Sequence, residues 1–191
     1  MALEIEKNGE IFYKEAAAKS ADPYEFACNL LIDEGQDVDH IGFGMDEETT
    51  EAVLKHPLAM LGSDGSSLAP YGPLGEGKPH PRNYGTFPRF LGYYVRERKL
   101  MPLPLAIKKI SSMAATKLGL AGRGTIKKGG FADIVVFDPQ TIADTATFIE
   151  PHQYPVGIDY VIVNGTTVVD HGEHTGKLPG KVLSGPGKSH T

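Results

Sequence analysis

Asp64 is the residue in this sequence whose surroundings best suit catalysis. It stands in Gly62-Ser63-Asp64-Gly65, directly after the apolar run from Leu58 to Leu61. Because the neighbouring glycines add no side-chain bulk, a ligand or a metal ion can approach the carboxylate closely. The same pattern is typical of an aspartate that begins a turn, and the spacing alone leaves both interpretations open.

A long segment rich in Gly and Pro follows, from Gly62 to Pro81. Its length favours an active-site loop over a simple connector. Within it, Gly72-Pro-Leu-Gly-Glu-Gly77-Lys78 has the glycine and lysine spacing of a phosphate-binding loop. Pro79 stands where such a loop needs Ser or Thr for magnesium, and His80-Pro81-Arg82 is not expected to open the helix that would hold the phosphate. We therefore reject nucleotide binding.

The residues before this loop predict an alternation of helices and strands that would position Asp64. A strong helix start lies at Asp22, with Pro23 at the first helical position and Glu25 completing a capping box. Helices are expected over Ile11–Lys19, from Asp22 to Gly35 and from Asp46 to Lys55, and strands over Val38–Phe43 and from Leu58 to Leu61. This order is typical of a parallel α/β unit, in which the carboxyl ends of the strands carry the chemistry.

The second half of the sequence predicts one amphipathic helix and then strands. The helix is expected from Leu103 to Leu118 and the first strand from Ala132 to Phe137. Asn164-Gly165 predicts the two-residue turn of a hairpin formed by the strands Tyr160–Val163 and Thr166–Val169. Residues 171–191 are expected to form a docked or frayed tail.

Composition narrows the class of protein. The 191 residues carry a formal charge of -5, which argues against nucleic acid as the main partner because phosphate binding relies on clustered Lys and Arg. No run approaches the roughly 18 apolar residues of a membrane span, so no membrane association and a cytoplasmic location are expected. The single cysteine, Cys28, excludes an internal disulfide and is expected to be buried packing within the Asp22 helix.

The loop residues also resemble a known family. Gly62-Ser63-Asp64-Gly65 and His80-Pro81-Arg82-x-Tyr84-Gly85-Thr86-Phe87-Pro88-Arg89, where x is any residue, are similar to a motif of the N-acyl-D-amino-acid deacylases, a branch of the metal-dependent amidohydrolase superfamily. Further matches extend almost to the end of the chain: Gly122-Arg123-Gly124, Ala132 to Pro139, Pro151-His152-Gln153-Tyr154-Pro155, Val163-Asn164-Gly165 and His174-Thr175-Gly176.

The resemblance implies an α/β fold: the carboxyl-terminal part of a (β/α)₈ metal-dependent-hydrolase barrel with strands of a small β-sandwich domain. Residues 1–119 would belong to the barrel, residues 120–170 to the sandwich, and residues 171–191 to a tail. The strand at Leu58 would then be the last strand of the barrel.

The resemblance also implies the roles of two residues. Asp64 would contact a catalytic Zn²⁺, take a proton from the attacking water and pass it to the leaving amine. Arg82 would bind the carboxylate of an N-acyl-D-amino acid substrate, a task suited to a planar, two-pronged donor. The reaction would release a carboxylate and a D-amino acid.

The remaining metal ligands of this family are not recognisable here. The seven histidines include no His-x-His pair, and Cys28 lies in a predicted helix. A full barrel needs roughly 250 residues, and a catalytic zinc normally needs three protein ligands. We therefore expect the 191-residue chain to be catalytically incomplete by itself.

Two alternatives stay open at this point. The chain could be a non-catalytic fragment that folds and self-associates as a homo-oligomer through exposed strand edges. It could also belong to a hydrolase of cyclic amides that resembles dihydropyrimidinase or dihydroorotase. The His80-Pro-Arg82 and Tyr84-Gly-Thr-Phe87 signatures argue against this last assignment.

Overall fold

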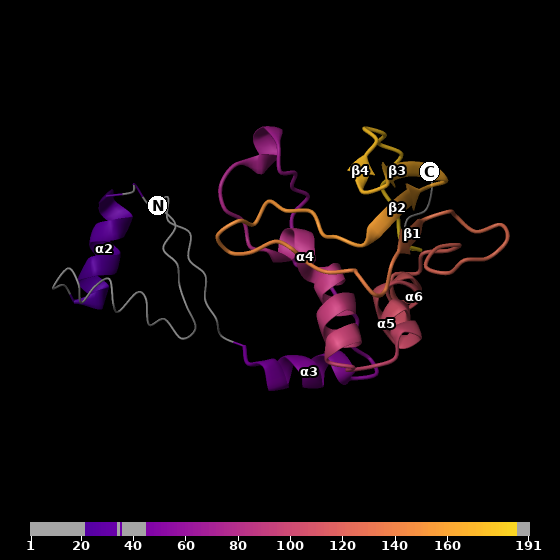
Figure 1. Cartoon of the computed structure of the whole chain (residues 1–191), viewed down its shortest axis with the longest axis horizontal. Helices are drawn as coiled ribbons and strands as arrows, with labels where there is room; N and C mark the ends of the chain where they lie inside the picture. The colour runs from indigo at the N-terminus through magenta and orange to yellow at the C-terminus, as the bar shows by residue number, and fades with distance from the viewer. Residues whose placement is uncertain (1–21, 34, 36–44, 187–191) are drawn as a thin grey trace.

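The computed structural model describes residues 22–33, 35 and 45–186, in which helices precede one antiparallel sheet (Figure 1). The helical elements are α2 (Pro23–Asp33), α3 (Glu47–Lys55), the 3₁₀ turn η2 (Gly72–Gly75), α4 (Arg82–Arg89), the π-helix η3 (Phe90–Glu97), α5 (Leu103–Ile110) and α6 (Ser112–Lys117). The strands are β1 (Ile134–Phe137), β2 (Ile158–Val163), β3 (Thr166–Asp170) and β4 (Glu173–His174). The helix predicted over Ile11–Lys19 and the strand predicted over Val38–Phe43 lie outside the described residues.

The helix starts predicted at Asp22 and Asp46 are confirmed by their caps. Asp22 Oδ1 accepts a hydrogen bond from the backbone N–H of Tyr24 at 2.9 Å at the start of α2. Asp46 Oδ1 accepts one from the N–H of Thr49 at 2.7 Å at the start of α3. In both helices the carboxylate satisfies a donor that has no intrahelical partner.

The expectation that Cys28 is buried is wrong, because the thiol is exposed in the structure. Phe26, two residues earlier on α2, is buried. Residues two apart lie on opposite faces of a helix, so the face that buries Phe26 turns Cys28 toward solvent.

The segment from Leu58 to Leu61, predicted to be a buried strand, is not a strand. Leu58 is 78% exposed, although Leu61 packs against the core. A strand needs a neighbour to pair its backbone N–H and C=O groups, and no segment of the described residues pairs with this one. The carbonyl of Ala59 instead accepts a hydrogen bond from Lys109 Nζ at 2.9 Å.

The helical rod formed by α4 and η3 was not predicted. The helix opens at Arg82, so the expectation that His80-Pro81-Arg82 cannot start one is wrong. Pro88 lies inside α4 and lacks the N–H that would continue the hydrogen-bond ladder, and the next turns are wound as a π-helix. Phe90, at the start of η3, is one of the most deeply buried side chains in the described residues.

The helix predicted from Leu103 to Leu118 is divided into α5 and α6 at Ser111. The backbone of Ser111 has φ of -135° and ψ of -83°, outside the helical region. Its hydroxyl donates to the carbonyl of Ile107 at 2.7 Å, a local bond that competes with the regular helix. Gly119, with φ of 66°, ends α6 as expected.

The hairpin predicted around Asn164-Gly165 is confirmed. Strands β2 and β3 pair antiparallel, and the turn residues Asn164 and Gly165 have φ of 48° and 78°. Such positive angles suit a two-residue turn between twisted strands. The sheet order is β1-β2-β3-β4 with antiparallel neighbours throughout, and β4 belongs to the tail that was expected to be docked or frayed.

The hydrophobic core joins the helices to residues beyond position 120. Ile142, which follows β1, packs in the same buried cluster as Phe90, Leu91 and Met101. A Cβ on Gly92 of η3 would lie only 2.4 Å from the carbonyl oxygen of Ile142, so the close approach requires glycine. The division at residues 119 and 120 stays a prediction. None of the described helices is both long and apolar enough to cross a bilayer.

Candidate functional site

Asp64 and Arg82, the two residues singled out from the sequence, lie together at the two ends of the long loop. Arg82 Nη2 is 3.2 Å from Asp64 Oδ2, and the two side chains are 44% and 88% exposed. Asp64 has φ of 49°, a left-handed conformation that a short polar side chain tolerates. Since water screens this ion pair, it contributes little to stability and is open to exchange with a ligand.

Asn83 holds the two ends of the loop together. Its Oδ1 accepts a hydrogen bond from the N–H of Ser66 at 2.5 Å, and its Nδ2 donates to the carbonyl of His80 at 2.7 Å. A Cβ on Gly65 would come within 3.1 Å of Asn83 Cα. Glycine at position 65 therefore allows the Asp64 segment to lie against the start of α4.

His80 packs beside the ion pair. Its Nδ1 accepts a hydrogen bond from the N–H of Arg82 at 3.0 Å, and its ring meets Phe148 edge to face with centroids 5.0 Å apart. Burial, followed by the positive charge of Arg82, lowers the pKa of His80 from its usual value near 6.5. Because Nδ1 is the acceptor, the proton of the neutral ring lies on Nε2.

A second histidine, His152, connects the loop to α4. Its Nε2 lies 3.0 Å from the carbonyl oxygen of Gly77, and its Nδ1 lies 2.9 Å from the hydroxyl of Tyr84. A carbonyl only accepts, so Nε2 donates, and in a neutral ring Nδ1 then accepts from the Tyr84 hydroxyl. His152 belongs to the segment between β1 and β2, which reaches from the sheet toward α4 in Figure 1.

Aromatic side chains complete this side of the site. The rings of Tyr84 and Tyr154 meet edge to face with centroids 5.8 Å apart. Burial raises the pKa of Tyr84, whereas burial and a hydrogen bond with Tyr71 raise the pKa of Tyr154 to about 12. Both phenols therefore remain protonated near neutral pH and act as hydrogen-bond donors, not as bases.

Arg123 belongs to a separate cluster that fastens the sheet. It pairs with Asp133, donates from Nη2 to Asn164 Oδ1 at 2.7 Å, and lies 4.1 Å above the centroid of Phe131. The backbone N–H of Asn164, followed by Arg123, lowers the pKa of Asp133. Every polar group named here has a partner within the cluster, so we assign it to stability.

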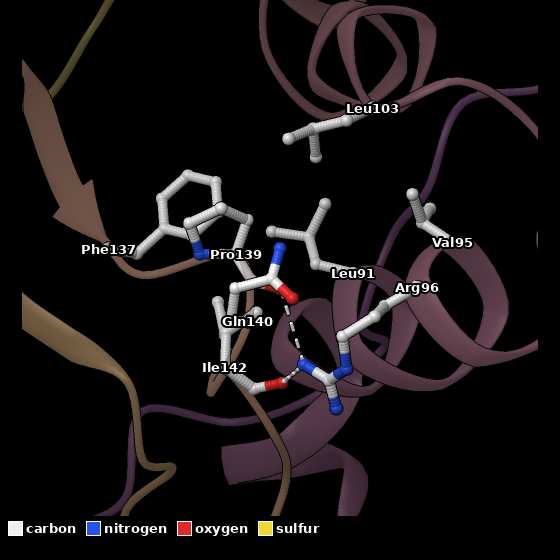
Figure 2. A pocket seen from close by; sticks show the side chains of 8 residues that line it. All are labelled: Leu91, Val95, Arg96, Leu103, Phe137, Pro139, Gln140 and Ile142. Carbon is white, nitrogen blue, oxygen red and sulfur yellow. Dashed lines mark hydrogen bonds between the residues drawn. The ribbon is translucent and has the colours of Figure 1, made fainter.

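A small cavity between η3 and the segment after β1 is lined mainly by apolar side chains, with the Arg96 guanidinium at its edge (Figure 2). Its volume is about 150 Å³. Arg96 Nη1 donates to the carbonyl of Ile142 at 2.7 Å, and its Nη2 pairs with Glu97 Oε1 at 3.0 Å. The guanidinium already has these acceptors, and neither Asp64 nor Arg82 lines the cavity. We therefore interpret the cavity as a packing gap.

The described residues do not complete a zinc site. Among them no three His, Cys, Asp or Glu side chains are grouped to hold a metal ion, and a catalytic zinc normally has three protein ligands. Asp64 Oδ2 faces the positive charge of Arg82, which disfavours a cation at the same oxygen. Asp64 therefore fits at most one position of such a site.

Sequence reasoning missed the residues that support the pair. His152 and Tyr84 occur within the family motifs but were given no role, and Asn83 and Lys109 were not singled out. Lys109 is 2% exposed and donates from Nζ to the carbonyl of His56 at 2.6 Å, just before the Asp64 segment. Most of their partners lie far away in the sequence, so no local pattern marks these residues.

Comparison with known proteins gives a consistent assignment. Residues 30–169 match the profile of the amidohydrolase family. D-aminoacylase from Alcaligenes xylosoxydans xylosoxydans is 41% identical over 179 residues, which cover 94% of this chain and 34% of that protein. N-acyl-D-aspartate deacylase from the same organism is 45% identical over 145 residues, which cover 75% of this chain and 28% of that protein.

A solved structure agrees with the sequence relatives. N-acyl-D-glutamate deacylase from Bordetella bronchiseptica, crystallised with zinc and a phosphonate inhibitor, superposes with a TM-score of 0.68 at 39% identity. The match covers 84% of this chain and 31% of that one. The chain thus spans about a third of the length of the relatives that it matches. These comparisons name deacylases, so they do not favour the cyclic-amide alternative.

Proposed function

The chain belongs to the amidohydrolase family, and from this premise we propose that it forms part of a zinc-dependent N-acyl-D-amino-acid deacylase. The reaction would hydrolyse the amide of an N-acyl-D-amino acid to a carboxylate and a D-amino acid. The observation that carries the proposal is the exposed pair of Asp64 and Arg82, with 3.2 Å between guanidinium and carboxylate. The relatives named D-aminoacylase and N-acyl-D-aspartate deacylase support the substrate class.

Asp64 is the proposed proton carrier. Its carboxylate takes a proton from the attacking water as the new C–O bond forms, and it returns this proton to the amide nitrogen as the C–N bond breaks. The acyl group then leaves as a carboxylic acid that ionises in water, and the nitrogen leaves as the amine of the amino acid. The exposure of Asp64 supports this role, because a water molecule can reach the carboxylate.

Arg82 is the proposed anchor for the substrate. Its guanidinium can form two parallel hydrogen bonds to the α-carboxylate of the amino acid. In the structure it pairs with Asp64, so a bound substrate carboxylate would replace one anionic partner of Arg82 by another. This exchange would also release Asp64 for proton transfer.

We further propose that zinc contacts Asp64 in the complete deacylase and takes its other ligands from outside the described residues. The barrel and sandwich assignments belong to the same proposal and follow from the family. The sequence has no His-x-His pair and the described residues do not complete a zinc site, so our proposal is that the 191-residue chain by itself neither binds stoichiometric zinc nor hydrolyses substrate.

Two measurements test this function. The purified chain is assayed for zinc by mass spectrometry and for hydrolysis of N-acetyl-D-methionine, where stoichiometric zinc with turnover would contradict catalytic incompleteness. In addition, this chain replaces the matching third of D-aminoacylase from Alcaligenes xylosoxydans xylosoxydans. Hydrolysis by this chimaera is expected, and a folded, zinc-loaded chimaera without activity would overturn the deacylase assignment.

Self-association is a second candidate function, favoured by an exposed apolar surface. Val53, Leu58 and Ala59 line an open groove between α3 and the following segment, and α3 has no buried residue. Apolar surfaces of this kind often mark interfaces. Light scattering over a range of concentrations tests it: dimers that Leu58→Glu converts to monomers would support it, and a monomer at every concentration would reject it.

A further inference from the structure

We propose that His152 is a positioning residue that fixes the long loop and thereby sets the spacing of Asp64 and Arg82. The importance of this position for catalysis rests on the proposed function. His152 itself touches neither Asp64 nor Arg82 through any hydrogen bond or ion pair found in the structure, and it would act through the loop and α4.

The first step is that His152 joins two segments from a third. Nε2 donates to the carbonyl of Gly77 in the loop at 3.0 Å, and Nδ1 lies 2.9 Å from the hydroxyl of Tyr84 on α4. The rings of His152 and Tyr84 also meet edge to face, with centroids 5.7 Å apart. Both ring nitrogens are therefore used: Nε2 donates to a carbonyl, and in the neutral ring Nδ1 accepts from the Tyr84 hydroxyl.

The second step is that both segments lead directly to the proposed site. Gly77 precedes His80, which accepts from the N–H of Arg82, and Tyr84 lies on the first turn of the helix that begins with Arg82. Asn83 fixes the start of the same loop through the N–H of Ser66. Without His152, the later half of the loop, which leads into Arg82, would lose its hydrogen bond at Gly77. Asn83 and the contact between His80 and Phe148 alone would then hold Arg82 less firmly against Asp64.

The chain offers a matched control for this histidine. His171 forms the same kind of pair with Tyr160, with 2.6 Å between His171 Nε2 and the Tyr160 hydroxyl, but it lies on the sheet after β3. His152→Gln is the conservative variant, because an amide also offers one donor and one acceptor at a similar spacing. Tyr84→Phe removes the hydroxyl alone.

Cleavage by the glutamate-specific protease Glu-C measures the order of the loop. The peptide bond from Glu76 to Gly77 adjoins the carbonyl that accepts from His152 Nε2. The bond from Glu173 to His174 in β4 is an internal reference. We expect His152→Ala to raise cleavage at Glu76 about tenfold, because the open loop becomes more populated when two hydrogen bonds are lost. Cleavage at Glu173 should stay constant. His152→Gln should remain within about threefold of the wild type, and His171→Ala should leave cleavage at Glu76 unchanged.

An unchanged rate at Glu76 in His152→Ala would overturn the inference. If both sites were cleaved faster, the substitution would have unfolded the chain, and Tyr84→Phe would then decide. An unchanged rate at Glu76 in that variant would overturn the inference as well, whereas a selective increase would support it.

A titration separates the inference from the proposed function. N-acetyl-D-glutamate is added to the ¹⁵N-labelled chain while the Nε–H signal of Arg82 is followed by NMR. If the wild type shows no shift, the carboxylate role of Arg82 fails, and His152 is judged by proteolysis alone. If the wild type shifts, His152→Ala should need about tenfold more ligand and His152→Gln should recover most of the affinity. Equal affinities would overturn the positioning role.

Discussion

Arg82 Nη2 lies 3.2 Å from Asp64 Oδ2, so the proposed substrate anchor and the proposed proton carrier neutralise each other before substrate arrives. Asn83 maintains this arrangement by binding Ser66 near one end of the loop and His80 near the other. Under the proposed function, a substrate carboxylate would therefore compete with Asp64 for the guanidinium. Because both carboxylates carry the same charge, the exchange leaves the net charge around Arg82 unchanged.

Substitution of the pair should separate chemistry from binding. In the chimaera with D-aminoacylase, Asp64→Ala should lower kcat by about 10²- to 10⁴-fold, because the proton carrier is lost. Arg82→Ala should chiefly raise KM, by about 10- to 100-fold, since a charged hydrogen-bond pair with the substrate is lost. Steady-state kinetics with N-acetyl-D-methionine gives both values. An Asp64→Ala enzyme with unchanged kcat would contradict the role of Asp64.

The buried Lys109 should contribute to stability more than its exposed neighbour. Its Nζ donates to the carbonyls of His56 and Ala59 at 2.6 and 2.9 Å. Lys109→Met keeps most of the volume but removes these donors, and we expect a loss of about 1–3 kcal/mol of unfolding free energy. Lys108→Met, at a more exposed position on α5, is the control and should have little effect. Urea unfolding measures both, and equal midpoints would reject this assignment.

Gly92 should not tolerate a side chain. A Cβ there would lie 2.4 Å from the backbone carbonyl of Ile142, which cannot rotate away. We expect Gly92→Ala to destabilise the protein by about 1–3 kcal/mol or more, as in other overpacked cores. Gly180→Ala serves as the control, because a Cβ at that position would meet no other atom within 4 Å. Thermal unfolding of the two variants should differ clearly; similar transition temperatures would show that Ile142 can move.

The pKa of His80 should lie below 6.5, the usual value for histidine. Burial disfavours the charged ring, and the positive charge of Arg82 adds to this effect. The unfolded chain therefore binds the His80 proton more tightly than the folded chain does. The contribution of neutral His80 to the free energy of unfolding is complete above about pH 6.5, and it is lost as the pH falls through the lower pKa of the folded state. NMR titration of the imidazole measures the pKa directly. Arg82→Ala and Phe148→Ala should each raise it, and a wild-type pKa at or above 6.5 would contradict the argument.

Local signals in the sequence predicted the elements whose causes are themselves local. The cap of α3 depends on Asp46 and a donor three residues away, and the β2–β3 turn depends on Asn164-Gly165. The pairing of Asp64 and Arg82 also lay within reach, because both flank the same loop and occur in the family motif. These features need few distant partners, so their residue types are informative by themselves.

The remaining features depend on contacts between distant segments. Leu58 to Leu61 has the composition of a strand, but a strand requires a pairing partner, which the described residues do not supply. The sequence predicted no helix over residues 82–97, where Pro88 lacks a backbone N–H, yet burial of Phe90 stabilises the rod. His152 gains its meaning only from Gly77 and Tyr84, to which no spacing pattern connects it.

The close contact between Gly92 and Ile142 has a consequence for engineering. The rod that begins with Arg82 is pressed at Gly92 against a backbone carbonyl from the segment after β1. Gly92 lies on the same helical rod as Arg82, so this contact helps to hold the rod that carries the guanidinium. If Arg82 anchors the substrate as proposed, volume changes around Ile142 are expected to alter substrate selectivity without any substitution at the binding surface.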